Sequence, residues 1–388
     1  MKERTRLATF LVAVVSSACT TAIDTDLDRV RELTRAPIEL PDEVGSSTPT
    51  DVRELLAKPL STDDAVRVAL LGNRAIRAQL RELGIARAGV VSAGSLPNPA
   101  VDVTLWEPSA TSRPVDVEID VEWDLKGLIL AAVAYGAASH DAEAARFAVA
   151  SAVIRSGFRV RSAVYAYRAA EREWLLTARA LDALAASRDA MRALDAAGNV
   201  PKLRLASQEA AYEGARQRAA DVELVVAGRR EALNVLLGLS GVETTWTLAS
   251  GGNPIPRTLN RPPDLGRRVL EANLDLAAGR ERLEGEARRT ALAQTRGWLP
   301  DLSALFRMEH HDEDYRYGGG VRVSVPLFDQ GRGETASAEA RFDADLERYY
   351  GAAIALRSAL RTTSAQLETA HAKVWHIREV LLPAQASV

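Results

Sequence analysis

The sequence predicts a mainly α-helical fold with a small β part, in which a strand hairpin and long helices occur twice. Within residues 115–127, VDVEIDVEWDLKG, positions 115–124 alternate strictly between apolar and acidic side chains, and residues 320–331, GVRVSVPLFDQG, repeat the alternation less strictly. Such alternation indicates a strand with two different faces. Residues 127–197 contain no proline and are rich in Ala, Leu, Glu and Arg, as expected of a long helix.

An internal duplication relates the two halves. Asn73, Pro97 and Asp124 recur in the same order as Asn273, Pro300 and Asp329, at sequence offsets of 200, 203 and 205. Nearly constant offsets of ordered landmarks indicate a repeat. The two strand–helix units are therefore expected to share one plan.

Composition excludes several classes of protein. The 388 residues include 49 Lys and Arg against 52 Asp and Glu, a net charge of −3 that argues against a general nucleic-acid binder. Gly318, Gly319 and Gly320 precede a strand and lack the Lys-Ser/Thr of a nucleotide-binding loop. No Ser-His-Asp or Cys-His arrangement suggests itself, so we expect no enzyme, cofactor or metal site.

The N-terminus is typical of an export signal. Residues 1–18 hold a positive start, an apolar run at 7–15 and small residues before Cys19. Cys19 is the only cysteine, and its position is similar to the acylated cysteine of bacterial lipoproteins. Ordinary signal cleavage, leaving Cys19 as a free thiol, is the alternative. No later apolar run reaches the about 18 residues of a membrane-spanning helix.

Residues 19–59 are expected to form an extended N-terminal linker, since they are polar and contain Pro37, Pro41 and Pro49. The first repeat then covers residues 60–241. Ser61 is a good N-cap for a helix that ends near Gly94.

A hairpin of strands at about 100–124 and long helices at 127–197 and 202–239 complete the first repeat. The helices reverse at Gly198. A helix of about 70 residues extends about 105 Å, so it must belong to a coiled-coil-like bundle.

An irregular linker at 242–262 precedes the second repeat at 263–388. Its strands are predicted at about 302–328, with residues 309–319 as the hairpin loop, and its long helix from 332. The stretch from Gly331 to Val388 is only about half as long as the first helix pair. We therefore expect the second repeat to lack its last helix. The bundle of long helices would then be incomplete, and any conduit that it encloses would be impaired by this truncation.

Four strands per chain cannot close a barrel, and an open sheet cannot sit in lipid with unsatisfied edges. Three chains would supply twelve strands, giving a trimeric β-barrel continued by an α-helical barrel. A soluble edge strand is the alternative for the strand taken alone. In the barrel, the residues expected to face the lumen are Asp116, Glu118, Asp120 and Glu122, and those expected to face lipid are Val115, Val117, Ile119, Val121, Trp123, Val321, Val323 and Val325.

The duplicated order of these landmarks resembles the TolC-like outer-membrane efflux protein family over residues 60–383, most specifically at residues 325–329, VPLFD. The resemblance implies a homotrimeric channel that docks on a periplasmic adaptor and an inner-membrane pump, with an acylated Cys19 as in its lipoprotein members. It places a periplasmic tip at the helix reversal. The tip residues expected to line the pore or touch an adaptor are Asp195, Gly198, Asn199, Lys202 and Arg204; otherwise the charged ones are ordinary solvated residues.

Two groups of histidines could be either metal ligands or ordinary solvated surface residues. His310 and His311 precede Asp312, Glu313 and Asp314 in the expected hairpin loop, where a solvated polar loop is favoured over a metal site. His371 and His376 do not share a helix face. A lipid-anchored periplasmic coiled-coil scaffold without channel activity, or an inactive remnant, are the competing functions.

Overall fold

The computed structural model describes residues 24–35, 38, 40–41, 49–107, 115–251, 254–311 and 314–386. The chain divides into two compact units. One draws on Met1–Val30, Glu82–Val149 and Ile255–Val388, and the other on Arg31–Arg81 and Ala150–Pro254. None of the helices within the described ranges has the length and apolar character needed to cross a membrane.

Both repeats begin with a helix that is broken at an asparagine. The single helix expected from Ser61 to Gly94 is two helices, α4 (Thr62–Gly72) and α5 (Arg74–Gly94), and the second repeat has α8 (Leu265–Ala272) and α9 (Leu274–Trp298). Asn73 Oδ1 accepts from the backbone N–H of Ala75 at 2.8 Å, and Asn273 Oδ1 accepts from that of Leu276 at 2.9 Å. Asparagine side chains that cap a new helix favour a break over continuation.

Ser61 caps α4 as expected. Its hydroxyl accepts from the backbone N–H of Asp64 at 3.0 Å, and its backbone N–H donates to the Asp64 carboxylate at 3.1 Å, which completes a capping box. The hydroxyl also donates to that carboxylate at 2.7 Å. The hydrogen bond from Ser61 lowers the pKa of Asp64, against the opposing effect of partial burial.

Replacing Ser61 with alanine is expected to lower stability at neutral pH by about 1 kcal/mol, because the cap is lost. The lowered pKa of Asp64 gives stability that is present above its unfolded pKa and is lost as pH falls through its folded pKa. Ser61→Ala raises that folded pKa toward the unfolded value, so its deficit should shrink in acid. Thermal unfolding followed by circular dichroism from pH 7 to pH 3 measures this; a constant deficit would contradict it.

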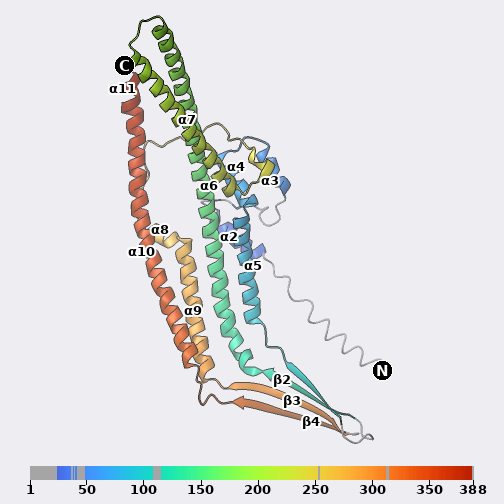
Figure 1. The fold of residues 1–388 in the computed structure, drawn as a ribbon. Coiled ribbons are helices and arrows are strands. Elements are labelled where there is room, and N and C mark those ends of the chain that lie inside the picture. Colours follow the sequence, from blue (N-terminus) through green and yellow to red (C-terminus); the bar gives the residue numbers. More distant parts are fainter. Residues whose placement is uncertain are drawn as a thin grey trace. The chain divides into compact units, whose positions relative to one another are not determined.

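The long helices lie where the sequence predicts them. α6 covers Leu125–Ala196 and α7 covers Lys202–Leu237, and they reverse at Gly198, which has φ 76° (Figure 1). In the second repeat α10 covers Arg332–His376 and runs on through the π-helical turn η2 (Ile377–Leu381) into α11 (Leu382–Ala386). The inter-repeat linker holds only the short 3₁₀ helix η1 (Gly241–Thr244) among its described residues.

The expectation that residues 19–59 form an extended linker is wrong for the part of this segment that the structure describes. It contains two helices, α2 (Asp24–Thr34) and α3 (Pro49–Leu56). Val30 is fully buried, and the buried carboxylate of Asp26 accepts from Arg146 of α6 at 2.8 Å. Packing of these side chains compensates for the low apolar content that favoured an extended chain. The expected signal peptide and Cys19 lie outside the described residues.

The four strands form one antiparallel sheet in the order β1-β2-β3-β4 (Figure 1). β1 is Ala100–Trp106, β2 is Asp116–Asp124, β3 is Asp301–His311 and β4 is Asp314–Ser324. The loop expected at 309–319 is wrong, because both strands continue through it until His311 pairs with Asp314. The polar residues of this stretch concealed its strand alternation.

A close contact between two glycines brings α9 against the start of α10. A Cβ on Gly297, near the end of α9, would lie 2.4 Å from the backbone oxygen of Gln330, and one on Gly331 would lie 2.8 Å from Gly297 Cα. Gly331 also has φ 66°, which disfavours other residues. These glycines let α9 approach the start of α10.

Gly297→Val is expected to destabilise the α9–α10 pair by about 2–4 kcal/mol, since backbone atoms must move to admit the side chain. Proteolysis of folded protein and its melting temperature measure the effect. Gly333→Val is the matched control, because a Cβ on Gly333 meets nothing within 4 Å. Equal losses in the two variants would contradict the close-contact explanation.

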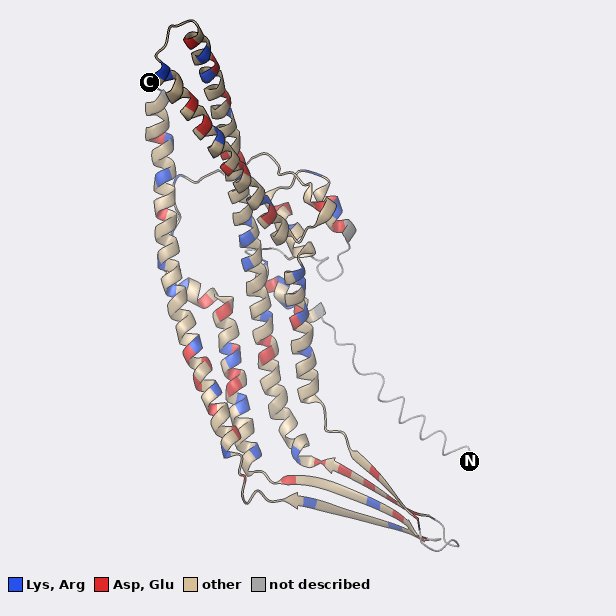
Figure 2. Ribbon diagram, viewed as in Figure 1, with Lys and Arg blue, Asp and Glu red and all other residues tan. Residues whose placement is uncertain are grey.

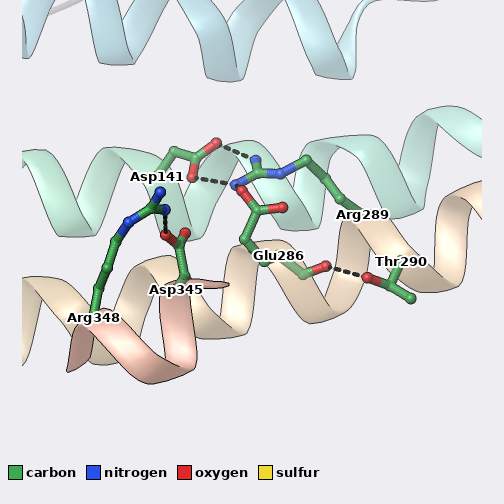
Figure 3. Close-up of polar contacts among 6 residues, drawn as sticks. All are labelled: Asp141, Glu286, Arg289, Thr290, Asp345 and Arg348. Carbon is green, nitrogen blue, oxygen red and sulfur yellow. Dashed lines mark hydrogen bonds and ion pairs between the residues drawn. The ribbon is translucent and has the colours of Figure 1, made fainter. Parts of the chain in front are cut away.

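Polar contacts connect α6 and α9 beside α10 (Figure 3). Arg289 donates to both carboxylate oxygens of Asp141, at 2.6 and 3.1 Å, and to Glu286 at 2.9 Å. Hydrogen bonding to Asp141 raises the pKa of Arg289 despite its partial burial. Arg348 and Asp345 pair on α10 at 2.5 Å. The Arg289–Asp141 ion pair thus links α9 to α6, whereas the Arg348–Asp345 pair lies within α10.

Candidate functional site

One face of the sheet is apolar over all four strands. The pairing places Val121 opposite both Val101 and Phe306, and Ala304 opposite Val321, so these side chains share a face. The other members of this apolar face are Val103, Leu105, Val117, Ile119, Trp123, Leu302, Met308, His310, Tyr315, Tyr317, Gly319 and Val323. His310 packs on the Tyr315 ring, with 4.5 Å between ring centroids.

Aromatic residues lie near both ends of the apolar face. Trp123 lies at the helix end of β2, where its indole N–H donates to the carbonyl oxygen of Pro97 at 2.8 Å. Tyr315 and Tyr317 lie near the hairpin end of β4. An apolar band between aromatic residues is the pattern of a membrane-exposed strand surface.

The opposite face carries charge. Its acidic residues are Asp102, Asp116, Glu118, Asp120, Glu122, Asp124, Asp301, Glu309 and Asp314, and its arginines are Arg307, Arg316 and Arg322. Figure 2 shows acidic bands on the strands and basic bands on β3 and β4. The face therefore stays net acidic, although the second hairpin adds cations that β2 alone does not show.

Arginines of the second hairpin bind the carboxylates of β2. Arg307 donates to both oxygens of Asp120, at 2.7 and 3.1 Å, and lies 2.7 Å from a Glu118 oxygen. Arg322 pairs with Glu122. His311 lies 2.8 Å from Asp116. All four predicted lumen residues thus share one face and are bridged to β3 or β4.

Two residues expected on the lipid face lie outside the strands. β2 begins at Asp116, directly after Val115, and β4 ends at Ser324, directly before Val325. The other six, Val117, Ile119, Val121, Trp123, Val321 and Val323, lie together on the apolar face. Whether that face meets lipid stays a prediction.

An aspartate binds the backbone N–H of a nearby glycine at the start of both α6 and α10. Asp124 Oδ1 accepts from the backbone N–H of Gly127, and Asp329 Oδ1 accepts from that of Gly331, both at 2.9 Å. Each carboxylate satisfies a donor at the start of a long helix. Lys126 adds an ion pair to Asp301 at 2.8 Å, which links α6 to β3.

The helix reversal gathers the predicted tip residues. The N–H of Asn199 donates to the carbonyl of Leu194 at 2.9 Å and that of Gly198 to Asp195 at 2.8 Å, the two bonds of a Schellman motif. Lys202 and Arg204 are exposed on the first turn of α7. Leu203 between them is 83% exposed, an apolar tip residue that the sequence analysis missed.

Metal ligation has no support from the histidines. His310 and His311 lie in β3 rather than in a loop, so their expected position is wrong. His371 Nε2 lies 2.9 Å from the carbonyl oxygen of Pro256. Across the residues with described positions, no group of three or more His, Cys, Asp or Glu is placed to hold a metal ion.

Comparison with known proteins bears on the fold. The chain is 25% identical over 344 residues to the cobalt-zinc-cadmium resistance protein CzcC of Cupriavidus metallidurans, covering 87% of this chain and 80% of that protein. It superposes on the outer-membrane protein VceC of Vibrio cholerae with a TM-score of 0.65 at 18% identity, covering 84% and 83% of the two chains. The outer-membrane channel OprN gives a TM-score of 0.66 at 17% identity, covering 90% and 82%.

The chain has the fold of the TolC-like outer-membrane channels. No family model matches it. The resemblance to the TolC-like family and the fold class, a small sheet with long helices, are confirmed.

Within this TolC-like fold, sequence reasoning missed Arg307, Arg316 and the tyrosines of the second hairpin, although the alternation of residues 321–325 places Arg322 on the face opposite the valines. Tyr315 and Tyr317 alternate with Asp314 and Arg316, a period of two that extends the strand toward the loop. That signal was available. The pairing of Arg307 with Asp120 was not, because it depends on the β2–β3 register.

Proposed function

We propose that the chain is the outer-membrane channel component of a tripartite efflux system, passively conducting substrates from the periplasm to the exterior. The observation that carries the proposal is the four-stranded sheet with one apolar and one charged face. Four strands leave both edges unpaired, and closure in lipid needs more strands. Three copies would form a closed barrel of twelve strands with the apolar faces outward.

The acidic excess of the charged face suits a lumen that favours cations. CzcC, by its name, serves resistance to cobalt, zinc and cadmium. Divalent cations are therefore the first substrates to test. An acylated Cys19 would add a membrane anchor.

The helix reversal at Gly198 is proposed as the periplasmic tip, where an adaptor docks and Asp195 faces the pore. Exposed Leu203 between Lys202 and Arg204 offers an apolar contact flanked by cations, a combination that suits a partner surface with carboxylates around an apolar pocket.

The test combines assembly and conduction. Purified protein in detergent is expected to run as a heat-sensitive trimer and, in planar bilayers, to conduct potassium in preference to chloride. Deleting the gene should raise cellular cobalt, zinc or cadmium, and wild-type protein should restore export. A monomer that does not conduct and becomes water-extractable with Cys19→Ala would instead support the lipid-anchored scaffold.

A further inference from the structure

The two edge strands of the sheet, β1 and β4, carry exposed apolar residues. Val101 and Val103 on β1 are each 59% exposed, and Val321 and Val323 on β4 are 63% and 52% exposed. We propose that β4 of one copy pairs with β1 of a second copy in one register, with Arg322 opposite Asp102 of the second copy. This inference rests on the proposed trimeric barrel and specifies its subunit interface.

The internal duplication supplies the register. Leu96-Pro97 precedes β1 as Leu299-Pro300 precedes β3, so Val101 of β1 corresponds to Ala304 of β3. Val101 pairs with Val121, and Ala304 pairs with Val321. By strand pairing, Val121 of β2 therefore corresponds to Val321 of β4. The second repeat has five more residues than the first between this valine and the matching aspartate, Asp329 against Asp124.

The β2–β3 junction inside the chain is then the template for the junction between copies. Glu122 lies opposite Leu305. Glu122 follows Val121 as Arg322 follows Val321, so Arg322 on β4 is the equivalent of Glu122. Leu305 follows Ala304 as Asp102 follows Val101, so Asp102 on β1 is the equivalent of Leu305. By the same correspondence, Val121 opposite Phe306 becomes Val321 opposite Val103, and Asp124 opposite Ser303 becomes Ser324 opposite Ala100.

Charge and face agree with this register. Val321 and Val323 meet Val103 and Val101 on the apolar face, while Arg322 meets Asp102 on the charged face. In the chain itself, Arg307 bridges two carboxylates at the β2–β3 junction. Arg322, already paired with Glu122, would bridge to Asp102 in the same way.

Size also agrees. The register sets Gly318 opposite Trp106 and Gly319 opposite Leu105 of the second copy, two side chains that are 61% and 65% exposed. A Cβ on Gly318 would meet nothing within 4 Å in the chain itself. Small residues on β4 therefore leave room for the large residues of an arriving β1.

Closure is geometrically sound. Asp102 lies opposite Asp120, Asp120 opposite Arg307, and Arg307 opposite Gly318. In the proposed register Gly318 lies opposite Trp106 of the next copy. One passage around the sheet of one copy therefore advances by four positions along β1, from 102 to 106. Three copies then advance by twelve positions in twelve strands. With ordinary strand spacing this gives a tilt of about 35°, as in closed barrels.

Disulfide trapping tests the register. Ser324→Cys with Ala100→Cys is expected to give heat-resistant covalent oligomers on non-reducing gels after oxidation, because directly opposite residues lie within disulfide range. The controls Ser324→Cys with Asp102→Cys and Ser324→Cys with Asn98→Cys test slips of two positions and should not cross-link. Single-cysteine variants control for Cys19.

A double-mutant cycle tests the ion pair. Arg322→Gln and Asp102→Asn should lower the temperature of trimer dissociation non-additively, whereas Arg322→Gln and Asp116→Asn should act additively. This register is overturned if a slipped cysteine pair cross-links, or if the effects of Arg322→Gln and Asp102→Asn are additive. If trimers and conduction persist in that case, the proposed function still stands. Monomers without conduction would overturn the proposed function as well.

Discussion

Replacing Trp246 with alanine is expected to lower the free energy of unfolding of its unit by about 3–5 kcal/mol, the usual cost of removing a buried aromatic side chain. Trp246 is 2% exposed and lies edge-on to Tyr167, with 5.4 Å between ring centroids. The Arg230 guanidinium lies 4.3 Å from its ring centroid and donates to its carbonyl oxygen at 2.7 Å. One substitution thus opens a cavity and removes the ring that faces this cation, although the backbone hydrogen bond remains available.

A hydrogen bond adds to this cost. The Trp246 indole N–H donates to buried Asn234 Oδ1 at 2.7 Å. Without the donor the Asn234 oxygen has lost this hydrogen bond in a buried place, which costs about 1–3 kcal/mol.

Urea unfolding followed by far-UV circular dichroism measures the loss. Trp246→Phe should keep most of the packing and lose only the hydrogen bond, and adding Asn234→Leu should recover part of that loss. If Asn234→Leu recovers none of the lost stability, the hydrogen bond between Trp246 and Asn234 contributes nothing. Replacing exposed Trp298 with alanine is the matched control, since it should change stability by less than about 1 kcal/mol.

Trp246 also shows what a sequence pattern can and cannot predict. It lies in the linker at 242–262, where irregular chain is expected and is observed, apart from η1, among the described residues. Its burial depends on Tyr167 of α6 and Asn234 of α7, and a local pattern does not record partners that lie in other elements. The isolated bridge between Leu60 and Leu248 is another contact of this kind.

The long helices α6, α7 and α10 and the strand β2 could be predicted because each carries its own signal, either a long proline-free run or strict alternation. The extent of β3 and β4 could not, since His310 and His311 look like loop residues until Tyr315 and Asp314 pair with them. In the candidate site, the acidic face of β2 was visible in the sequence. The pairing of its carboxylates with Arg307 and Arg322 was not, because that depends on which strands are neighbours.

Val103→Arg is expected to abolish the accumulation of trimers in the outer membrane. The side chain lies on the apolar face opposite Ile119, and an arginine on the lipid face near the bilayer midplane costs about 2–4 kcal/mol. In the proposed trimeric barrel the cost is incurred in each of three chains, so it is large beside the stability of the barrel. Membrane fractionation and unheated gel electrophoresis measure the outcome.

The neighbouring residue provides the matched control. Thr104 has the same depth on the same strand but lies on the charged face opposite Glu118, so Thr104→Arg adds a cation beside an anion and should leave trimers intact. Loss of trimers with Thr104→Arg but not with Val103→Arg would invert the assignment of the faces. Tolerance of both would mean that neither face meets lipid, because only water accommodates an arginine equally well on both sides of a strand.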